Sequence, residues 1–243
     1  MIFSGVDGCK GGWFIITLLD NDNYKSKVCI DKKFDKFEEV VEYVKDSTLT
    51  LIDIPIGLID KGCDERQCDK EARKLLGKPR SSSVFPPPTR PALKGNSFEE
   101  CSYLNFECSG RKLTVFAYGI LPKIREVDEY FLNHPGIQNK IKETHPEVCF
   151  YGISGKAMQF SKRKKEGKEE RLEILKKVFP LSCEIYNKCI NKFKRIEVAK
   201  DDILDALVST VSAKFAYYNP ISIPEKEQRD SEGIRMEIVY SKL

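Results

Sequence analysis

The chain begins with the stretch Ile2-Phe3-Ser4-Gly5-Val6-Asp7-Gly8-Cys9-Lys10-Gly11-Gly12-Trp13-Phe14-Ile15-Ile16, around which the other elements are arranged. An apolar run carries one acid, Asp7, into a turn rich in glycine, and a second apolar run then leads away from it. A carboxylate buried on a core strand costs several kcal/mol unless it is paired or binds a metal. The glycines at 8, 11 and 12 leave the backbone uncovered, so we expect that a phosphate can approach this turn.

The length and composition are those of an ordinary globular protein. The 243 residues suffice for one large domain or two small ones, and the net charge of +4 permits an anionic partner without requiring one. The apolar runs are too short to span a membrane, so we expect no membrane partner. Asp7 and Lys10 interrupt the apolar start of the chain, and we therefore predict no signal peptide.

The cysteines indicate a reducing compartment. Nine cysteines are scattered along the chain without a CxxC pair, and there are two histidines. A disulfide framework is not expected at this length without a signal peptide, and no spacing fits a structural zinc site. We expect reduced thiols and a cytoplasmic location.

The first third of the chain alternates strands with one helix. Apolar runs predict the strands, and apolar residues at helical spacing predict the helix. The last strand of this part carries a second acid within an apolar run, Asp53, and Pro55 and Gly57 end it. We expect strands over 2–6, 13–19, 24–30 and 49–54, with a helix over 37–45 between the last two.

A segment of different composition extends from about residue 61 to 121, and we treat it as an insertion. It contains a charged helix over 66–77 that ends at a glycine. A loop over 81–91 follows, whose proline density excludes a helix or an inner strand. This loop is either a solvated surface loop or a lid that contacts substrate through Arg80 and Arg90.

The remaining elements are mostly helical. The run of charges over 162–171 is either a solvated loop with a helix start or a patch that contacts phosphates. We expect a helix over 121–132, a strand over 141–150 running into a turn, helices over 172–178 and 185–193, a packed helix over 201–215 and an edge strand over 234–240.

Acidic residues recur at the predicted strand ends and at the start of the late helix. Sets of carboxylates are the ligands that Mg²⁺ and Mn²⁺ prefer. Each acid also has a purely structural explanation, such as a helix cap for Asp201 or an ion pair for Glu147. That explanation is weakest for Asp7 and Asp53 together, because both lie within apolar strand runs. The acids in question are Asp7, Asp53, Glu143 or Glu147, and Asp202 with Asp205.

These features together resemble a known fold and a known family. Three strands, a helix and a strand, with acids on the first and fourth strands and on a late helix, resemble the ribonuclease H-like fold. The helix over 202–207 resembles the acidic C-terminal helix of RuvC-type Holliday junction resolvases. The chain also resembles the uncharacterised DUF429 family, regarded as predicted nucleases of that fold, through its motifs GVDGCKGGW at 5–13, IDIPIGL at 52–58, SSVFP at 82–86, PKI at 122–124 and ETHPEV at 143–148.

The resemblance implies a fold and a set of site residues. It implies an α/β domain over 1–243 in which helices flank a mixed five-stranded sheet of ribonuclease H-like type, with the insertion described above. The small resolvases have no counterpart of that insertion. The implied metal ligands are Asp7 on the first strand, Asp53 on the fourth strand, and Asp202 and Asp205 on the late helix, and Glu143 is implied as a further catalytic acid of the YqgF-related type.

The register of the late helix is ambiguous because Asp201 precedes Asp202. On an ideal helical wheel Asp201 and Asp205 flank the packed face, whereas Asp202 points away from it.

Our first functional hypothesis is a metal-dependent nuclease. Carboxylates holding one or two Mg²⁺ or Mn²⁺ ions would activate a water molecule for attack on a phosphodiester. The partner is then DNA or RNA, between which the sequence does not distinguish, and a homodimer is expected by analogy with resolvases. The candidate phosphate contacts are Lys10, Arg66, Arg73, Lys123 and the basic run that begins at Lys162.

Two other hypotheses come from different classes of protein. Sugar kinases and actin-like ATPases share this core, and in an ATP-dependent phosphotransferase the turn over 8–12 would hold the ATP phosphates. The lack of a second glycine-rich hairpin and of an adenosine motif counts against that hypothesis. The third hypothesis is a non-catalytic binding module that keeps its acids for structural reasons.

Overall fold

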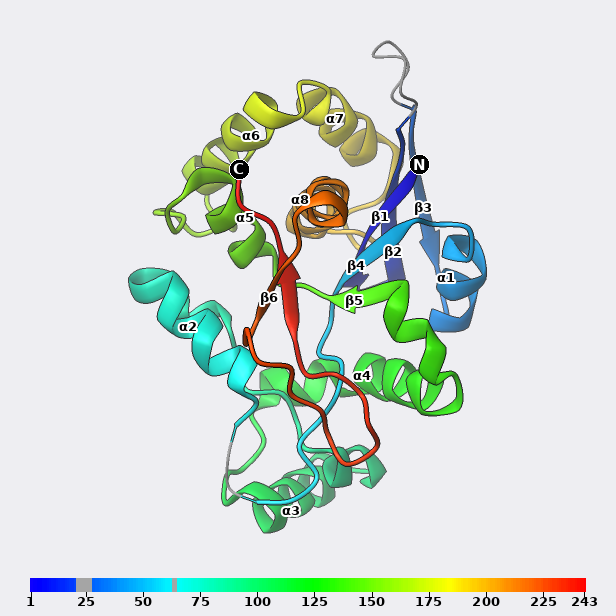
Figure 1. The fold of residues 1–243 in the computed structure, drawn as a ribbon, viewed down its shortest axis with the longest axis vertical. Coiled ribbons are helices and arrows are strands. Elements are labelled where there is room, and N and C mark those ends of the chain that lie inside the picture. The colour runs from blue at the N-terminus through cyan, green and yellow to red at the C-terminus, as the bar shows by residue number, and fades with distance from the viewer. Residues whose placement is uncertain (21–27, 63–64) are drawn as a thin grey trace.

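The computed structural model describes residues 1–20, 28–62 and 65–243, and its centre is one mixed β-sheet (Figure 1). Its strands are β1 (Ile2–Cys9), β2 (Gly12–Leu19), β3 (Val28–Phe34), β4 (Leu49–Asp53) and β5 (Ile141–Glu143). The five strands lie in the order β3-β2-β1-β4-β5. The β1–β2 and β2–β3 pairs are antiparallel, whereas β1–β4 and β4–β5 are parallel. The predicted mixed five-stranded sheet flanked by helices is therefore confirmed.

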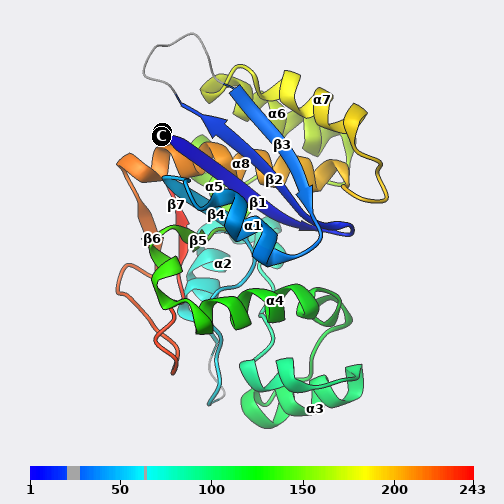
Figure 2. The same cartoon turned by 90° about the vertical axis from the view of Figure 1, so that its right-hand side faces the viewer.

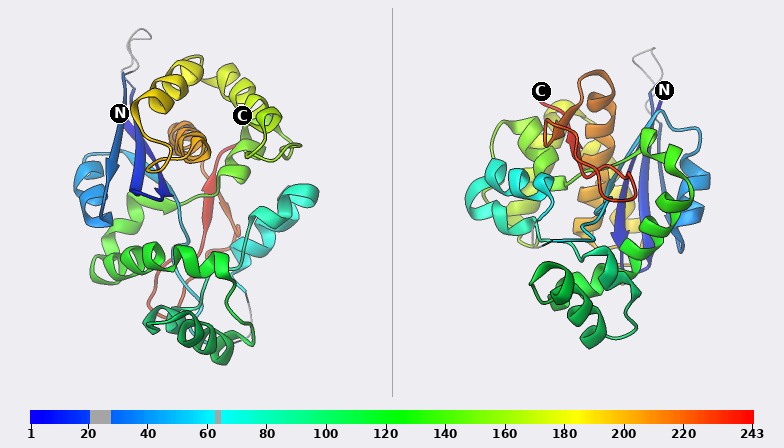
Figure 3. Two further views of the ribbon diagram at one scale, coloured as in Figure 1. Left: turned by 180° about the vertical axis from the view of Figure 1, so that it is seen from behind. Right: turned by 60° about the horizontal axis from the view of Figure 1, so that its bottom comes forward.

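Helices cover both faces of this sheet, as Figure 2 shows most clearly. One face is covered by α1 (Phe37–Val44) and α4 (Val115–Asn133). The other face is covered by α8 (Lys200–Tyr218), and around α8 lie α5 (Pro146–Ser154), α6 (Lys165–Val178) and α7 (Ser182–Lys192). The view from behind in Figure 3 shows α8 enclosed between the sheet and these three helices.

The other elements lie between β4 and α4 and in the C-terminal part of the chain. Between β4 and α4 lie α2 (Gln67–Arg80) and α3 (Phe98–Ser109), with α3 at the lower end of the molecule in Figure 1. Single 3-10 turns occur at Ser81–Ser83, Arg90–Lys94 and Pro135–Asn139. A separate antiparallel pair is formed by β6 (Ile221–Ile223) and β7 (Ile238–Tyr240).

The strands alternate between two buried clusters, one on each face of the sheet. Phe3 and Leu51 pack on the side of α8, whereas Val6 and Ile52 pack on the side of α1 and α4. Successive side chains of a strand point to opposite faces, so this alternation places every odd-numbered residue of β1 and β4 toward α8. Asp7 and Asp53 belong to that odd-numbered set.

The main chain of α8 lies directly against the sheet at Gly5 of β1. A methyl group on Gly5 would overlap the main-chain oxygen of Ala206 and the main-chain nitrogen of Thr210. The Thr210 hydroxyl lies 2.8 Å from the carbonyl oxygens of both Ile16 and Ala206, so the same turn of α8 is also joined to β2. The absence of a side chain at Gly5 thus sets the distance between α8 and the sheet.

Some predicted boundaries differ from the structure. The predicted strand over 141–150 is wrong beyond Glu143, since α5 begins at Pro146, and proline is favoured in the first turn of a helix. The edge strand predicted over 234–240 is limited to β7, which pairs with β6 outside the main sheet. Of the strand predicted over 24–30, residues 24–27 lie outside the described residues, and β3 continues to Phe34.

Several helices are longer than predicted. α4 begins at Val115, where the Thr114 side chain accepts a hydrogen bond from the Ala117 amide, and the helix continues through Pro122. α6 begins within the charge run, at Lys165, which supports the interpretation of that run as a loop and helix start. The glycine stop predicted for α2 is present, because Gly77 interrupts its helical geometry with a φ of 57°.

We predict that Gly5→Ala lowers the free energy of unfolding by about 3 kcal/mol, because the added methyl group meets main-chain atoms of α8 that cannot move independently. The matched control is Gly119→Ala on the exposed side of α4, where a methyl group meets nothing within 4 Å. That change is expected to stabilise the protein by up to about 1 kcal/mol. Urea denaturation measures both, and equal effects of the two substitutions would contradict the role given to Gly5.

Candidate acidic metal site

Asp7 and Asp53 lie side by side at the ends of two parallel strands. The register of the β1–β4 pair places Asp7 directly beside Asp53, and both side chains project from the face that α8 covers. Asp7 is 7% exposed, and Asp53 is partly buried. Two like charges on neighbouring strands repel each other, so either a bound proton or a positively charged partner stabilises this pair.

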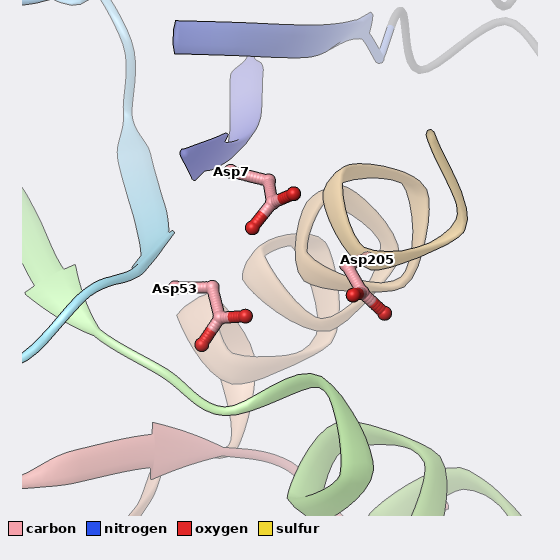
Figure 4. Close-up of side chains that lie close together, drawn as sticks. All are labelled: Asp7, Asp53 and Asp205. Carbon is pink, nitrogen blue, oxygen red and sulfur yellow. The ribbon is translucent and has the colours of Figure 1, made fainter. Parts of the chain in front are cut away.

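The third member of the group, Asp205, comes from α8. It immediately precedes Ala206, the residue whose carbonyl oxygen lies against Gly5, and it is 2% exposed. One carboxylate oxygen from each of Asp7, Asp53 and Asp205 lies within 4.8 Å of the other two. Figure 4 shows the three side chains together, two from strand ends and one from the helix.

The donor set of this group fits a small divalent cation. Mg²⁺ binds oxygen at about 2.1 Å in octahedral geometry, so ligands on opposite sides of the ion are about 4.2 Å apart. The oxygen separations of up to 4.8 Å therefore require only small rotations of the carboxylates to hold one ion. The three oxygens are hard ligands without a nearby thiolate in the group, which favours Mg²⁺ or Mn²⁺ over softer metals.

The carboxylates of the site repel one another in the absence of a cation. Burial raises the pKa of Asp7 well above its ordinary value, and the charges of Asp202 and Asp53 raise it further. Burial, and then the charge of Asp205, raise the pKa of Asp53 to about 7. Burial also raises the pKa of Asp205, although Lys162 acts in the opposite direction. Desolvation combined with like charges is typical of functional sites.

Lys162 supplies a positive charge to this group. Its ammonium group forms an ion pair with Asp205, while the lysine side chain remains 36% exposed. Burial lowers the pKa of Lys162, but the charges of Asp205, Asp7 and Asp53 outweigh that effect and raise the pKa, so this lysine is protonated near neutral pH. Lys162 is thus the predicted phosphate-contacting residue that lies nearest to the acids, and it also partly neutralises them.

The start of α8 determines the positions of Asp201 and Asp202. The helix begins at Lys200 with Ala199 as its N-cap, so the interpretation of Asp201 as the N-cap is wrong. The Asp202 carboxylate accepts a hydrogen bond of 2.8 Å from the Ala199 amide. Burial raises the pKa of Asp202 to about 6, and its charge acts on Asp7, so Asp202 borders the group without belonging to the close set of three.

Glu143 lies in a separate buried ion cluster. Its two carboxylate oxygens lie 2.8 Å and 2.7 Å from the Nη1 and Nη2 atoms of Arg66, and it accepts a hydrogen bond of 2.6 Å from the Ile56 amide. Arg66 also binds Asp69 and the carbonyl oxygens of Ile56 and Gly57. Arg66 is 2% exposed. The structure therefore corrects two expectations: Arg66 cannot contact a phosphate, and the Glu143 carboxylate is occupied by this arginine.

The other predicted phosphate contacts occupy different positions. Lys10 is exposed beside the β1–β2 turn. Lys123 donates a hydrogen bond of 2.7 Å to the carbonyl oxygen of Gly12 and lies 4.9 Å from the centre of the Trp13 ring. Arg73 pairs with Glu65 and donates to the carbonyl oxygen of Val84. The structure thus does not bring these three cations to the acidic group.

The glycines of the β1–β2 turn are partly covered by protein. A methyl group on Gly8 would meet the Lys123 side chain, and one on Gly12 would overlap the main-chain oxygen of Phe34. The Gly11 amide donates a hydrogen bond of 3.0 Å to the carbonyl oxygen of Glu197. The three glycines are partly buried, so these contacts narrow the space for a phosphate without closing it. Close packing explains the glycines.

A cavity of about 480 Å³ adjoins the acidic group. Asp53, Asp205 and Lys162 line one part of it, and Ser82, Ser83 and Phe85 from the proline-rich segment line another. Part of the proline-rich segment therefore lies beside the acidic group. Arg80 lines the same cavity, whereas Arg90 binds Asp128 and Asp230 and serves the structure. Arg163 belongs to the predicted basic run and Glu147 to the candidate acids, whereas sequence reasoning gave no role to Phe116 or His145, which also line the cavity.

Fold and site together define an α/β protein whose parallel strand ends and covering helix bring three carboxylates close together. The chain belongs to the family described as "Protein of unknown function (DUF429)", which it matches over residues 5–229. Comparison with curated proteins and with solved structures gave no match. No helix in the described parts of the chain is long and apolar enough to cross a membrane.

We predict that Asp53 makes the stability of the metal-free protein depend on pH. Its pKa is about 3.9 in the unfolded chain and about 7 in the folded protein. The contribution of Asp53 to the free energy of unfolding is therefore fully present below about pH 4, and it is lost as the pH rises to about 7. The Asp53→Asn variant should gain roughly 2–4 kcal/mol over the wild type across that interval, measured by urea denaturation in EDTA. The exposed control Asp46→Asn should show no such gain, and parallel pH profiles for all three proteins would refute the prediction.

We predict that Glu143→Gln destabilises the protein by about 3 kcal/mol, because the change removes one charge of a buried ion pair and leaves Arg66 with an unpaired donor. The matched control is Glu42→Gln, which breaks an exposed ion pair with Lys45 and should change stability by less than about 1 kcal/mol. Thermal unfolding measures both variants. A stable Glu143→Gln protein that has lost its response to Mn²⁺ would instead place Glu143 in the metal site.

Proposed function

We propose that this protein is a metal-dependent nuclease of ribonuclease H-like fold that hydrolyses phosphodiester bonds of DNA or RNA. The observation that carries the proposal is the close set of Asp7, Asp53 and Asp205, brought together from two parallel strand ends and a late helix. The order of three strands, a helix and a fourth strand agrees with that fold. Membership of a family of unknown function neither adds to the proposal nor opposes it.

The residues of the site have distinct roles in the proposed reaction. Asp7, Asp53 and Asp205 would hold Mg²⁺ or Mn²⁺, and Asp202 would add negative charge at the border of the group. Such a cation, when bound, activates a water molecule and stabilises the charge that develops on the phosphodiester. Lys162 is partly exposed, so its ammonium group can pair with a substrate phosphate as well as with Asp205.

Specific contacts also bear on the two alternative hypotheses. The turn over 8–12 is packed against Lys123, Phe34 and Glu197, which disfavours it as a site for the phosphates of ATP. A non-catalytic module is supported by the pairing of Lys162 with Asp205, because a lysine can neutralise acids without a metal. The response of the protein to Mn²⁺ distinguishes that module from the nuclease.

We predict that Asp7→Asn abolishes Mn²⁺-dependent cleavage of nucleic acid, because one of three ligands becomes a neutral amide. The melting temperature without metal should stay the same or rise, since the change removes a repelling buried charge. The assay uses labelled single-stranded, duplex and junction substrates of DNA and RNA with Mn²⁺. Full cleavage by the Asp7→Asn variant would rule out the assignment.

A binding experiment separates this proposal from the structural explanation of the acids. Mn²⁺ should raise the melting temperature of the wild type and of the control Asp46→Asn, but not that of Asp205→Asn. If Mn²⁺ leaves the wild-type melting temperature unchanged, Lys162 is the only counter-charge that the acids need, and the non-catalytic module is favoured.

A further inference from the structure

The cavity of about 480 Å³ beside the acidic group is lined by aromatic and basic side chains as well as by acids. A site that binds only a metal ion has no need of the aromatic side chains. The cavity reaches Asp53 and Asp205 on one side and two aromatic rings, Phe85 and Phe116, on another. These residues come from the end of β4, from α8, from the proline-rich segment and from the first turn of α4. Groups that are distant in the sequence thus converge on one space next to the candidate catalytic residues.

The aromatic wall presents an exposed ring. Phe116 is 58% exposed, and the Phe85 ring packs edge-on against it with the ring centres 5.1 Å apart. Exposing a phenylalanine ring to water forgoes part of the roughly 1.5–3 kcal/mol that its burial would supply. A ring held in this way at a polar cavity is suited to stacking against a planar base.

Positive charge and unpartnered polar atoms surround the same cavity. Arg80 and Arg163 line it, and neither forms an ion pair within the described residues. The Nε atom of Arg80, the Nδ1 atom of His145 and one carboxylate oxygen of Glu147 are buried without a hydrogen-bond partner among those residues. Buried polar atoms of this kind usually bind a protein group, a water molecule or a ligand, so these three atoms are available to a polar ligand in the cavity.

The size of the cavity limits what can enter it. Pockets for small ligands measure about 300–1,000 Å³, and this volume accommodates roughly one nucleotide unit. A double helix is far too wide to enter, so a base can reach Phe116 only when it is not paired. Single strands, loops and extruded nucleotides meet this condition.

We propose that this cavity binds one unpaired nucleotide next to the phosphate that is cleaved, with its base stacked on Phe116 and its phosphates near Arg80 and Arg163. The substrate class is therefore nucleic acid with a nucleotide that is already unpaired, in a single strand or a loop, and not a fully paired duplex. The position relative to the cleaved phosphate rests on the proposed nuclease function, whereas the preference for an unpaired strand is a property of binding alone.

Fluorescence anisotropy tests the binding directly. The probe is a labelled single strand of about 12 nucleotides, compared with a blunt duplex of the same sequence, in Ca²⁺ buffer. The single strand should bind roughly tenfold or more tightly than the duplex. Phe116→Leu should weaken single-strand binding by roughly 5- to 100-fold, and Phe116→Trp should retain it, because stacking requires an aromatic ring.

The control is Tyr103→Leu, which removes an aromatic ring of α3 that is 61% exposed and does not line the cavity. This variant should bind as the wild type does, and thermal unfolding confirms that each variant is folded. Equal binding of single strand and duplex, or a Phe116→Leu variant that matches Tyr103→Leu, would overturn the proposal. Displacement of the strand by micromolar ATP would also overturn it in favour of a free nucleotide.

Cleavage assays distinguish failure of this inference from failure of the proposed function. If Mn²⁺ supports no cleavage but single-strand binding depends on Phe116, the nuclease assignment fails and the nucleotide subsite stands. If blunt duplex and single strand are cleaved at equal rates, the nuclease assignment stands and the subsite fails.

Discussion

The contact between Gly5 of β1 and the second and third turns of α8 is the constraint on which the site depends. Because no side chain separates them, the Ala206 carbonyl and the Thr210 amide lie directly against the strand. Asp205 precedes Ala206, so the same contact carries its carboxylate to Asp7 and Asp53. The hydroxyl of Thr210 joins α8 to β2 as well, which fixes the helix along its axis. The contact that packs α8 against the sheet therefore also determines how close the three carboxylates lie.

This arrangement concentrates negative charge where the protein also excludes water. Burial and mutual repulsion raise the pKa of Asp7 and hold that of Asp53 at about 7, while Lys162 compensates only in part. A group of this kind is less stable than a neutral one of the same shape, which agrees with the general cost of buried charge. A cation or a substrate that binds these carboxylates would offset this loss of stability. The adjoining cavity offers space for such a substrate.

The sequence allowed the strand acids to be predicted better than their partners. Asp7 and Asp53 each lie within an apolar run, and strand alternation with parallel pairing then places them together. Which acid of α8 lies near Asp7 and Asp53 depends on where the helix begins and on how it packs against Gly5. A helical wheel gives neither of these. Arg66 stands at the start of a charged helix, and its sequence predicts an exposed side chain. The structure instead buries Arg66 together with Glu143, which is 77 residues away in the sequence. The cavity escaped prediction because its walls come from separate parts of the chain.

The ion cluster of Arg66, Asp69 and Glu143 joins the segment over 61–121 to the main sheet. Arg66 and Asp69 belong to that segment, whereas Glu143 ends the outermost parallel strand of the main sheet. A shortened chain without residues 61–121 would leave Glu143 buried and unpaired, a state that buried carboxylates tolerate poorly. Residues 61–121 therefore cannot simply be deleted. A shortened protein would also need an apolar residue in place of Glu143.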